Sequence, residues 1–172
     1  MKNKFMQITA GTFLALLMLF GATQIFVSGQ ESGPVVFPEL RGRPVSIEGV
    51  WQTTVTQRNC QTGNIIRTFR GLSTYHEGGT MSETSAALSP ALRSPGHGVW
   101  EKQSHSAYSS SFIFQFYSPD GALAGTQKIT SNRTLEGRNG NTYDTTTSIQ
   151  VFDVNNNLLG TGCATATATR FE

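Results

Sequence analysis

Charged residues are scarce in this 172-residue chain, at 14% of the total, and no segment shows the apolar spacing of an amphipathic helix. With 37% apolar and 10% aromatic residues, the composition excludes a disordered chain, which needs high charge and few aromatics. The 13 basic residues fall to 11 when Lys2 and Lys4 are set aside, which equals the 11 acidic residues. A balanced chain without a basic patch does not fit a nucleic-acid-binding protein. The length allows one ordinary domain.

Several motifs that carry chemistry are also missing. No G-x-S-x-G segment is present to place a serine nucleophile. The glycines at 78–79 and 137–140 precede expected strands rather than helices, so they do not form a phosphate loop. No C-x-x-C or H-x-x-H spacing indicates a metal site. We therefore expect no cofactor and no metal, and the sequence assigns no catalytic residue.

The N-terminal part has the features of an export signal. Lys2 and Lys4 precede an apolar stretch over residues 8–27, and Val27 and Gly29 are tolerated at a cleavage site before Gln30. This order is typical of a secretory signal peptide, and an uncleaved anchor is the alternative because a membrane helix needs about 20 apolar residues. We expect a signal peptide over 1–29, an irregular arm over 30–47 and a folded domain over 48–172. The protein would then be secreted or periplasmic, without membrane contact after cleavage.

From Gly49 onward the apolar residues alternate with a period of two, and turn residues interrupt them regularly. Eight strands joined mostly by tight turns predict an all-β antiparallel meander. Closure into an up-and-down barrel would remove its two exposed edges. The expected strands cover residues 50–59, 65–76, 80–84, 97–103, 108–117, 122–135, 142–153 and 158–171.

The two cysteines test this closure. In an exported protein a disulfide between Cys60 and Cys163 is the leading interpretation, and two free thiols are the alternative. If the first and last strands pair antiparallel with Trp51 opposite Arg170, Cys60 and Cys163 are opposite each other to within a small slip. The spacings place both cysteines on the face opposite that of Trp51 and Arg170.

The segment Gly49-Val50-Trp51, together with Arg170 near the end of the last strand, resembles the calycins, which include the lipocalins. The resemblance implies a structural role for Trp51 and Arg170, in which the indole closes the barrel base and the guanidinium stacks on the indole. The first turn, at 61–64, is shorter than the long first loop of lipocalins. The topology also resembles the allene oxide cyclase and dirigent barrels. Residues 94–101 are similar to a segment of uncharacterised exported bacterial proteins, which brings no activity with it.

An eight-stranded barrel is either filled by side chains or able to hold one small ligand. We expect a small apolar or amphipathic molecule to bind non-covalently inside it. A cyclase- or isomerase-type enzyme on a lipid-like substrate, and a structural or protein-binding module with a filled interior, are the alternatives. The oligomeric state is left open. The inward aromatic side chains expected to line a pocket are Trp100, Tyr108, Phe112, Phe114 and Phe116.

Other inward positions and candidate residues indicate no particular ligand or reaction. The inward set also includes Leu123 and Ile129, by alternation along their strand. The connection over 85–96 is the longest in the domain and is either a lid or a plain cover. His76 with Glu77, or His97 with Glu101, could form an acid–base pair, and two histidines at one rim could bind a metal. No spacing enforces either arrangement.

Overall fold

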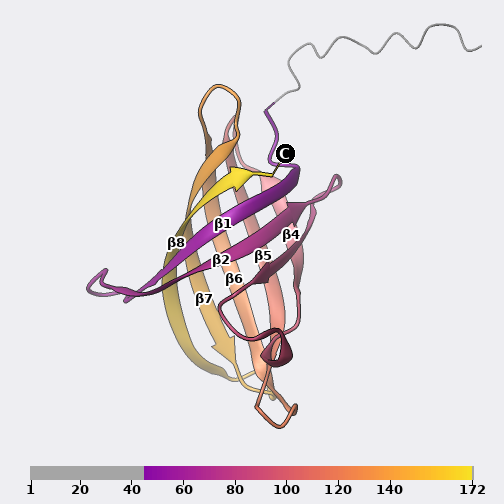
Figure 1. Cartoon of the computed structure of the whole chain (residues 1–172), viewed down its shortest axis with the longest axis vertical. Helices are drawn as coiled ribbons and strands as arrows, with labels where there is room; N and C mark the ends of the chain where they lie inside the picture. Colours follow the sequence, from indigo (N-terminus) through magenta and orange to yellow (C-terminus); the bar gives the residue numbers. More distant parts are fainter. Residues whose placement is uncertain (1–44, 172) are drawn as a thin grey trace, which may run out of the picture. The chain divides into compact units, whose positions relative to one another are not determined.

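The computed structural model describes residues 45–171, and these form a closed barrel of eight antiparallel strands (Figure 1). Each strand pairs with its neighbours in the sequence, and the last strand pairs with the first. A single 3-10 turn, η1 (Pro90–Leu92), lies between β3 and β4. The strands are β1 (Gly49–Arg58), β2 (Ile65–Tyr75), β3 (Thr80–Ser85), β4 (Gly96–Lys102), β5 (Ala107–Tyr117), β6 (Leu123–Glu136), β7 (Thr142–Phe152) and β8 (Leu158–Arg170).

The structure confirms the fold class predicted from the alternating pattern. Each expected strand begins and ends within one residue of the observed strand. In β8, for example, Ala164, Ala166 and Ala168 are buried on the inner face. Threonines occupy the positions between them and face outward. Small inward side chains on β8 leave room for the phenylalanines of β5 across the interior, as a barrel with large and small inner residues requires.

The seam between β1 and β8 closes the barrel, and its register agrees with the prediction. Trp51 pairs with Arg170 at one end of the seam, and Arg58 pairs with Cys163 at the other. Cys60 follows β1 by two residues and forms the disulfide with Cys163, with Cα atoms 5.2 Å apart. The first and last strands are therefore joined covalently at one end and by an inward-facing Trp–Arg pair at the other.

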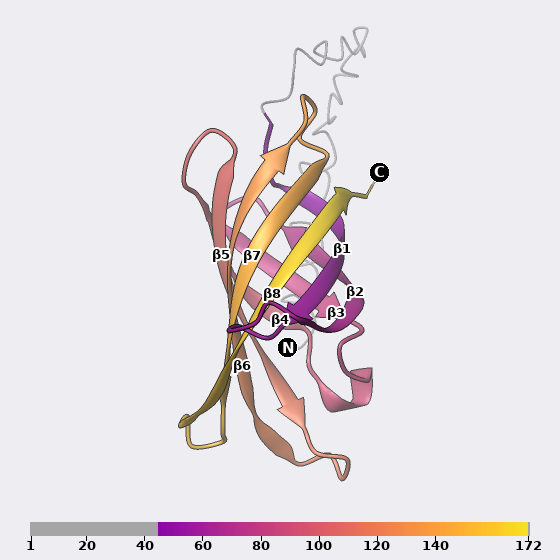
Figure 2. The same cartoon turned by 90° about the vertical axis from the view of Figure 1, so that its left-hand side faces the viewer.

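The connections divide into two sets at the two ends of the barrel. The turns over 76–79, 103–106 and 137–141 lie at the end where β1 begins and β8 finishes. The turns over 59–64, 86–95, 118–122 and 153–157 lie at the other end. There the β5–β6 and β7–β8 hairpins extend well beyond the shorter strands (Figures 1 and 2).

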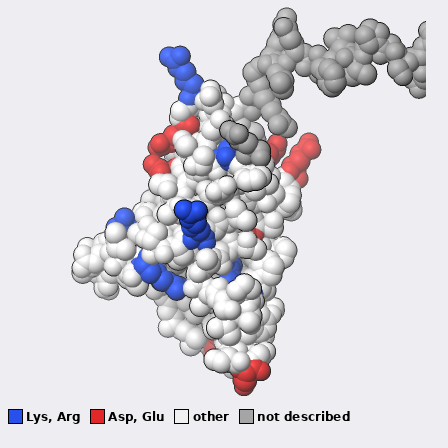
Figure 3. All heavy atoms as spheres, in the orientation of Figure 1, with Lys and Arg blue, Asp and Glu red and all other residues white. Residues whose placement is uncertain are grey.

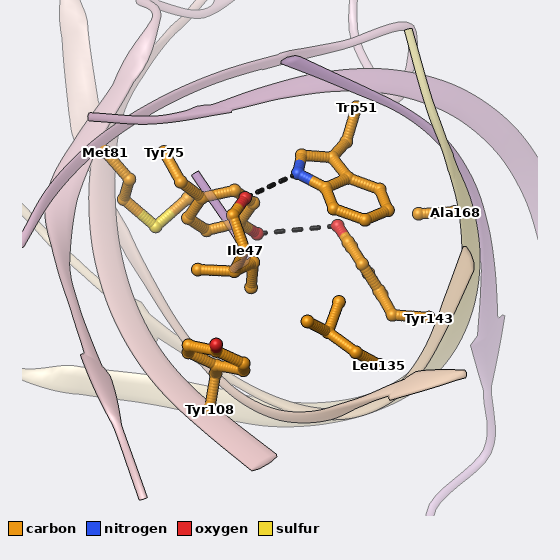
Figure 4. Packing of buried hydrophobic residues seen from close by; sticks show 8 residues of the cluster. All are labelled: Ile47, Trp51, Tyr75, Met81, Tyr108, Leu135, Tyr143 and Ala168. Atoms are coloured by element: carbon orange, nitrogen blue, oxygen red, sulfur yellow. Dashed lines mark hydrogen bonds between the residues drawn. The ribbon is translucent and has the colours of Figure 1, made fainter. Parts of the chain in front are cut away.

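The first of these ends is filled by a buried apolar cluster (Figure 4). Trp51 is fully buried at its centre, its ring centroid 4.7 Å from that of Tyr143 and 4.3 Å from the Arg170 guanidinium carbon. This geometry is the stacked arrangement expected from the calycin resemblance. The members of the cluster are Ile47, Trp51, Tyr75, Met81, Tyr108, Leu135, Tyr143 and Ala168.

Residues 45–48 form part of this base, although residues 45–47 belong to the predicted irregular arm. Ile47 is fully buried, and its carbonyl accepts a hydrogen bond of 2.7 Å from Trp51 Nε1. The Tyr108 hydroxyl donates to the carbonyl of Val45 at 3.3 Å. Arg170 donates to the carbonyls of Ser46 and Glu48. The segment has no regular secondary structure, yet its backbone carbonyls are bound by side chains of the barrel.

The prediction that Leu123 points inward is wrong. Leu123 is 45% exposed at the start of β6. The β5–β6 register shifts between Phe116 and Tyr117, opposite Leu123 and Gly125, and Gly125 has a φ of 154°. A bulge of this kind adds a residue to one strand, so the simple alternation that is valid from Gly125 onward does not extend to Leu123.

The outer surface is sparsely charged on the face shown in Figure 3, where uncharged residues cover most of the area. Among residues 45–171 no helix has the length and apolarity needed to cross a membrane. The predicted signal peptide over 1–29 and most of the predicted arm lie outside the described residues.

Candidate functional site in the barrel interior

The barrel interior contains a cavity of about 190 Å³ between the base cluster and the opposite end. Residues from seven of the eight strands line it, together with Ala87 of the 86–95 connection. Its apolar wall consists of Val55, Phe69, Met81, Phe112, Phe114, Ile129, Ile149, Val151, Ala164 and Ala166. Its polar groups are the hydroxyls and amides of other inward-facing residues, chiefly Thr53, Gln57, Ser73, Gln127, Ser131, Thr145 and Thr147. The interior is therefore partly hollow, with a mixed surface.

The structure separates the five aromatic residues predicted to bind a ligand. Phe112 and Phe114 line the cavity. Tyr108 is a member of the base cluster, and Trp100 packs against that cluster. Phe116 pairs with Gly125 beyond the cavity lining, near the far end of β5. A ligand contact thus stays a prediction for Phe112 and Phe114, while Trp100 and Tyr108 are placed to support the base.

Aromatic and hydrogen-bond contacts fix these two base residues. Trp100 meets Tyr75 edge to face at a centroid distance of 6.4 Å, and Tyr108 at 5.9 Å. Its indole Nε1 donates to the carbonyl of His76 at 3.0 Å. The partly buried Trp100 indole and the buried Tyr108 phenol both have such partners, because an unpaired polar atom in an apolar cluster is costly.

The 86–95 connection is attached to the barrel wall by an ion pair. Arg93 is 6% exposed, and its Nη2 lies 2.7 Å from Glu83 Oε2 of β3. The same guanidinium donates to Ser85 and lies over the Phe114 ring at 4.0 Å from the centroid. Ala87, earlier in the connection, accepts a hydrogen bond from Arg67 Nη1 at 2.9 Å. These contacts hold the connection beside the cavity at the end opposite the base.

A second buried arginine, Arg133 of β6, lies between the base and the cavity and is 5% exposed. Its Nη2 donates to Ser110 Oγ at 2.7 Å. The guanidinium carbon lies 4.9 Å from the Tyr75 ring centroid and 5.5 Å from that of Tyr143. Nε and Nη1 have no hydrogen-bond partner among the described residues. Within residues 45–171 the one salt bridge is Glu83–Arg93, so Arg133 lacks a carboxylate partner.

The two tyrosines beside Arg133 provide hydroxyl groups at the cavity floor. Their oxygens are 3.4 Å apart, and both residues are 2% exposed (Figure 4). Burial, with the neighbouring Tyr75 as a smaller cause, raises the pKa of the Tyr143 phenol well above its usual value. Tyr143 therefore stays protonated near neutral pH and remains available as a hydrogen-bond donor.

The histidines do not meet at the cavity. His97 is exposed on β4, and His105 is exposed in the 103–106 turn. His76 follows β2, and its Nε2 is 3.4 Å from the Ser82 hydroxyl on the surface. The described residues contain no group of three or more His, Cys, Asp or Glu side chains arranged to hold a metal ion. The cavity therefore brings together none of the acid–base pairs considered from the sequence.

Sequence reasoning missed Arg133, Glu83 and Arg93 as interior residues. For Arg133 a signal was present, because it is two residues from Leu135 and four from Ile129, on the inward face by simple alternation. Glu83 likewise shares a face with Met81. Arg93 lies in an irregular connection where no periodicity applies, so only the folded structure reveals its position.

No protein-family model matches this chain, and a search of curated proteins found no match. The structure shows an all-β, eight-stranded, closed up-and-down barrel with a partly hollow interior, an architecture consistent with a calycin-like fold.

Proposed function

We propose that this protein is an exported, calycin-like barrel that binds a small apolar or amphipathic molecule non-covalently. The observation that carries the proposal is the cavity itself, which has a sealed aromatic base and apolar walls from several strands. Eight-stranded barrels of this kind are wide enough to hold one small ligand. Ligand sites typically combine an apolar lining with a few polar groups that fix orientation.

The disulfide supports export as part of the proposal. Disulfides form and persist in secreted and periplasmic proteins, whereas cytosolic thiols are kept reduced. The Cys60–Cys163 bridge would be stable in the same compartment to which the predicted signal peptide would direct the chain.

Size sets the ligand class. A cavity of about 190 Å³ is smaller than the roughly 300–1,000 Å³ typical of sites for drug-sized molecules. It would hold one end of a slender molecule such as a medium-length acyl chain, with the remainder extending toward the end opposite the base. Phe112 and Phe114 would contact that chain on the β5 side.

Filling the cavity should abolish binding without unfolding the barrel. Ala164 is 4% exposed and lines the cavity. We expect Ala164→Leu to weaken binding of decanoate and 1-decanol by at least about 10-fold, because the added side chain occupies the ligand volume. Isothermal titration calorimetry on the oxidised protein measures this change.

The matched control is Thr167→Leu, which adds a leucine to the exposed outer face of the same strand. It should leave both affinities unchanged. If wild-type protein binds neither amphiphile, or if Ala164→Leu binds both as tightly as wild type, the cavity is not the binding site and the proposal is wrong.

A further inference from the structure

Arg133 is an unusual residue for the interior of a barrel. An ionised group removed from water is strongly disfavoured unless it is paired and hydrogen-bonded. Arg93, the other buried arginine, is paired with the Glu83 carboxylate, although its Nε also has no hydrogen-bond partner among the described residues. Arg133 has one hydrogen bond, to Ser110, and contacts two tyrosine rings, while Nε and Nη1 are unpartnered among the described residues.

The position of Arg133 points to a ligand rather than to the fold. β6 and β2 lie on opposite sides of the barrel, so a guanidinium that starts on β6 and reaches Tyr75 of β2 extends across the interior. It is part of the cavity lining, directly above the base cluster. The unpartnered Nη1 of Arg133 can donate a charge-assisted hydrogen bond to a carboxylate oxygen.

We propose that Arg133 binds the anionic head of the ligand, and that the ligand class is a carboxylate-bearing amphiphile held head-down in the barrel. The inference rests on the proposed function and names the chemistry of its ligand. Nη1 would donate to the carboxylate, and Tyr143, which lines the same cavity with its ring centroid 5.5 Å from the guanidinium carbon, would add its hydroxyl as a further donor.

The residues that line the cavity above Arg133 indicate the direction in which the apolar chain of the ligand would extend. Along β6 the inward residues change from Arg133 and Ser131 near the base to Ile129 and then Gln127. Phe112 and Ile149 lie at the level of Ile129 on the neighbouring strands. An apolar chain would pass this belt on its way from the base toward the opposite end of the barrel. The order of polar floor, apolar belt and polar mouth fits an amphiphile with one charged end.

The net charge of the interior agrees with an anion. Glu83 and Arg93 neutralise each other, and the uncompensated charges facing the cavity are Arg133 at the floor and Arg67 toward the mouth. A cationic amphiphile would therefore meet a positive floor, and a neutral alcohol would offer the donors of Arg133 only an uncharged acceptor. Both should bind more weakly than the carboxylate.

The test compares three ligands of equal chain length, decanoate, 1-decanol and decyltrimethylammonium, by titration calorimetry on the full-length oxidised protein at neutral pH. Wild type should bind decanoate about 10- to 100-fold more tightly than decanol, which corresponds to charge-assisted hydrogen bonds gained only by the acid. Arg133→Met should remove this preference and leave the affinity for decanol within about 3-fold of wild type. The control Arg70→Met removes the same charge from the exposed outer face of β2 and should preserve the preference.

The melting temperature of each ligand-free variant provides a second measurement. A purely structural arginine would make Arg133→Met melt well below wild type, whereas removal of an unpartnered buried charge should leave it unchanged or higher. Equal affinities of wild type for decanoate and decanol, with both bound, would overturn the role of Arg133 while the cavity remains a binding site. Binding of neither ligand would overturn the proposed function as well.

Discussion

Replacing both cysteines should destabilise the barrel by about 4–5 kcal/mol. The Cys60–Cys163 bridge closes a loop with a sequence separation of 103 residues, and the entropy lost by an unfolded chain rises with loop length. The bridge also lies at one end of the β1–β8 seam, which is the contact that converts the meander into a closed barrel. Guanidinium unfolding of wild type and of the Cys60→Ser/Cys163→Ser double variant measures the difference.

Serine is a suitable replacement because Cys60 is exposed, so the double variant loses little packing along with the cross-link. Wild type treated with a reductant should unfold at the same denaturant concentration as the double variant. A loss of less than about 1 kcal/mol would contradict this interpretation, since it would mean that the seam is held without help from the bridge.

Trp51→Ala should cost about 3–5 kcal/mol, the range for removing a large aromatic side chain from a core. Trp51 is fully buried, contacts Tyr143 and Arg170, and supplies the hydrogen bond that fixes the carbonyl of Ile47. Its loss would open the base of the barrel and release the 45–48 segment. Urea unfolding followed by circular dichroism gives the free energy.

Trp100→Ala is the matched control, since this tryptophan packs at the edge of the same cluster and is only partly buried. It should cost clearly less than Trp51→Ala. Equal losses for the two variants would show that the two tryptophans support the base equally, contrary to the central place given to Trp51.

The strands could be predicted closely because each carries its own information. Alternation of apolar and polar residues fixes which face of a strand is buried, and the turn residues fix where it ends. The register of the closing seam followed from two facts, the Trp51–Arg170 resemblance and the positions of Cys60 and Cys163. These are long-range constraints that a single sequence rarely provides.

The remaining features depend on tertiary contacts. Leu123 was misplaced because a bulge at Gly125 interrupts the alternation. The packing of Val45 and Ile47 into the base had no periodic signal. Trp100 and Tyr108 share the inward face with Phe112 and Phe114, but which level of the barrel is filled and which is hollow depends on all eight strands together.

Native mass spectrometry of the oxidised protein, purified from its source without detergent, tests the binding function most directly. The prediction is a non-covalent adduct with the mass of a slender amphiphile, which is lost on denaturation and is absent from the Ala164→Leu variant. Detection of the bare polypeptide alone, which also takes up neither decanoate nor decanol when these are added, would contradict it.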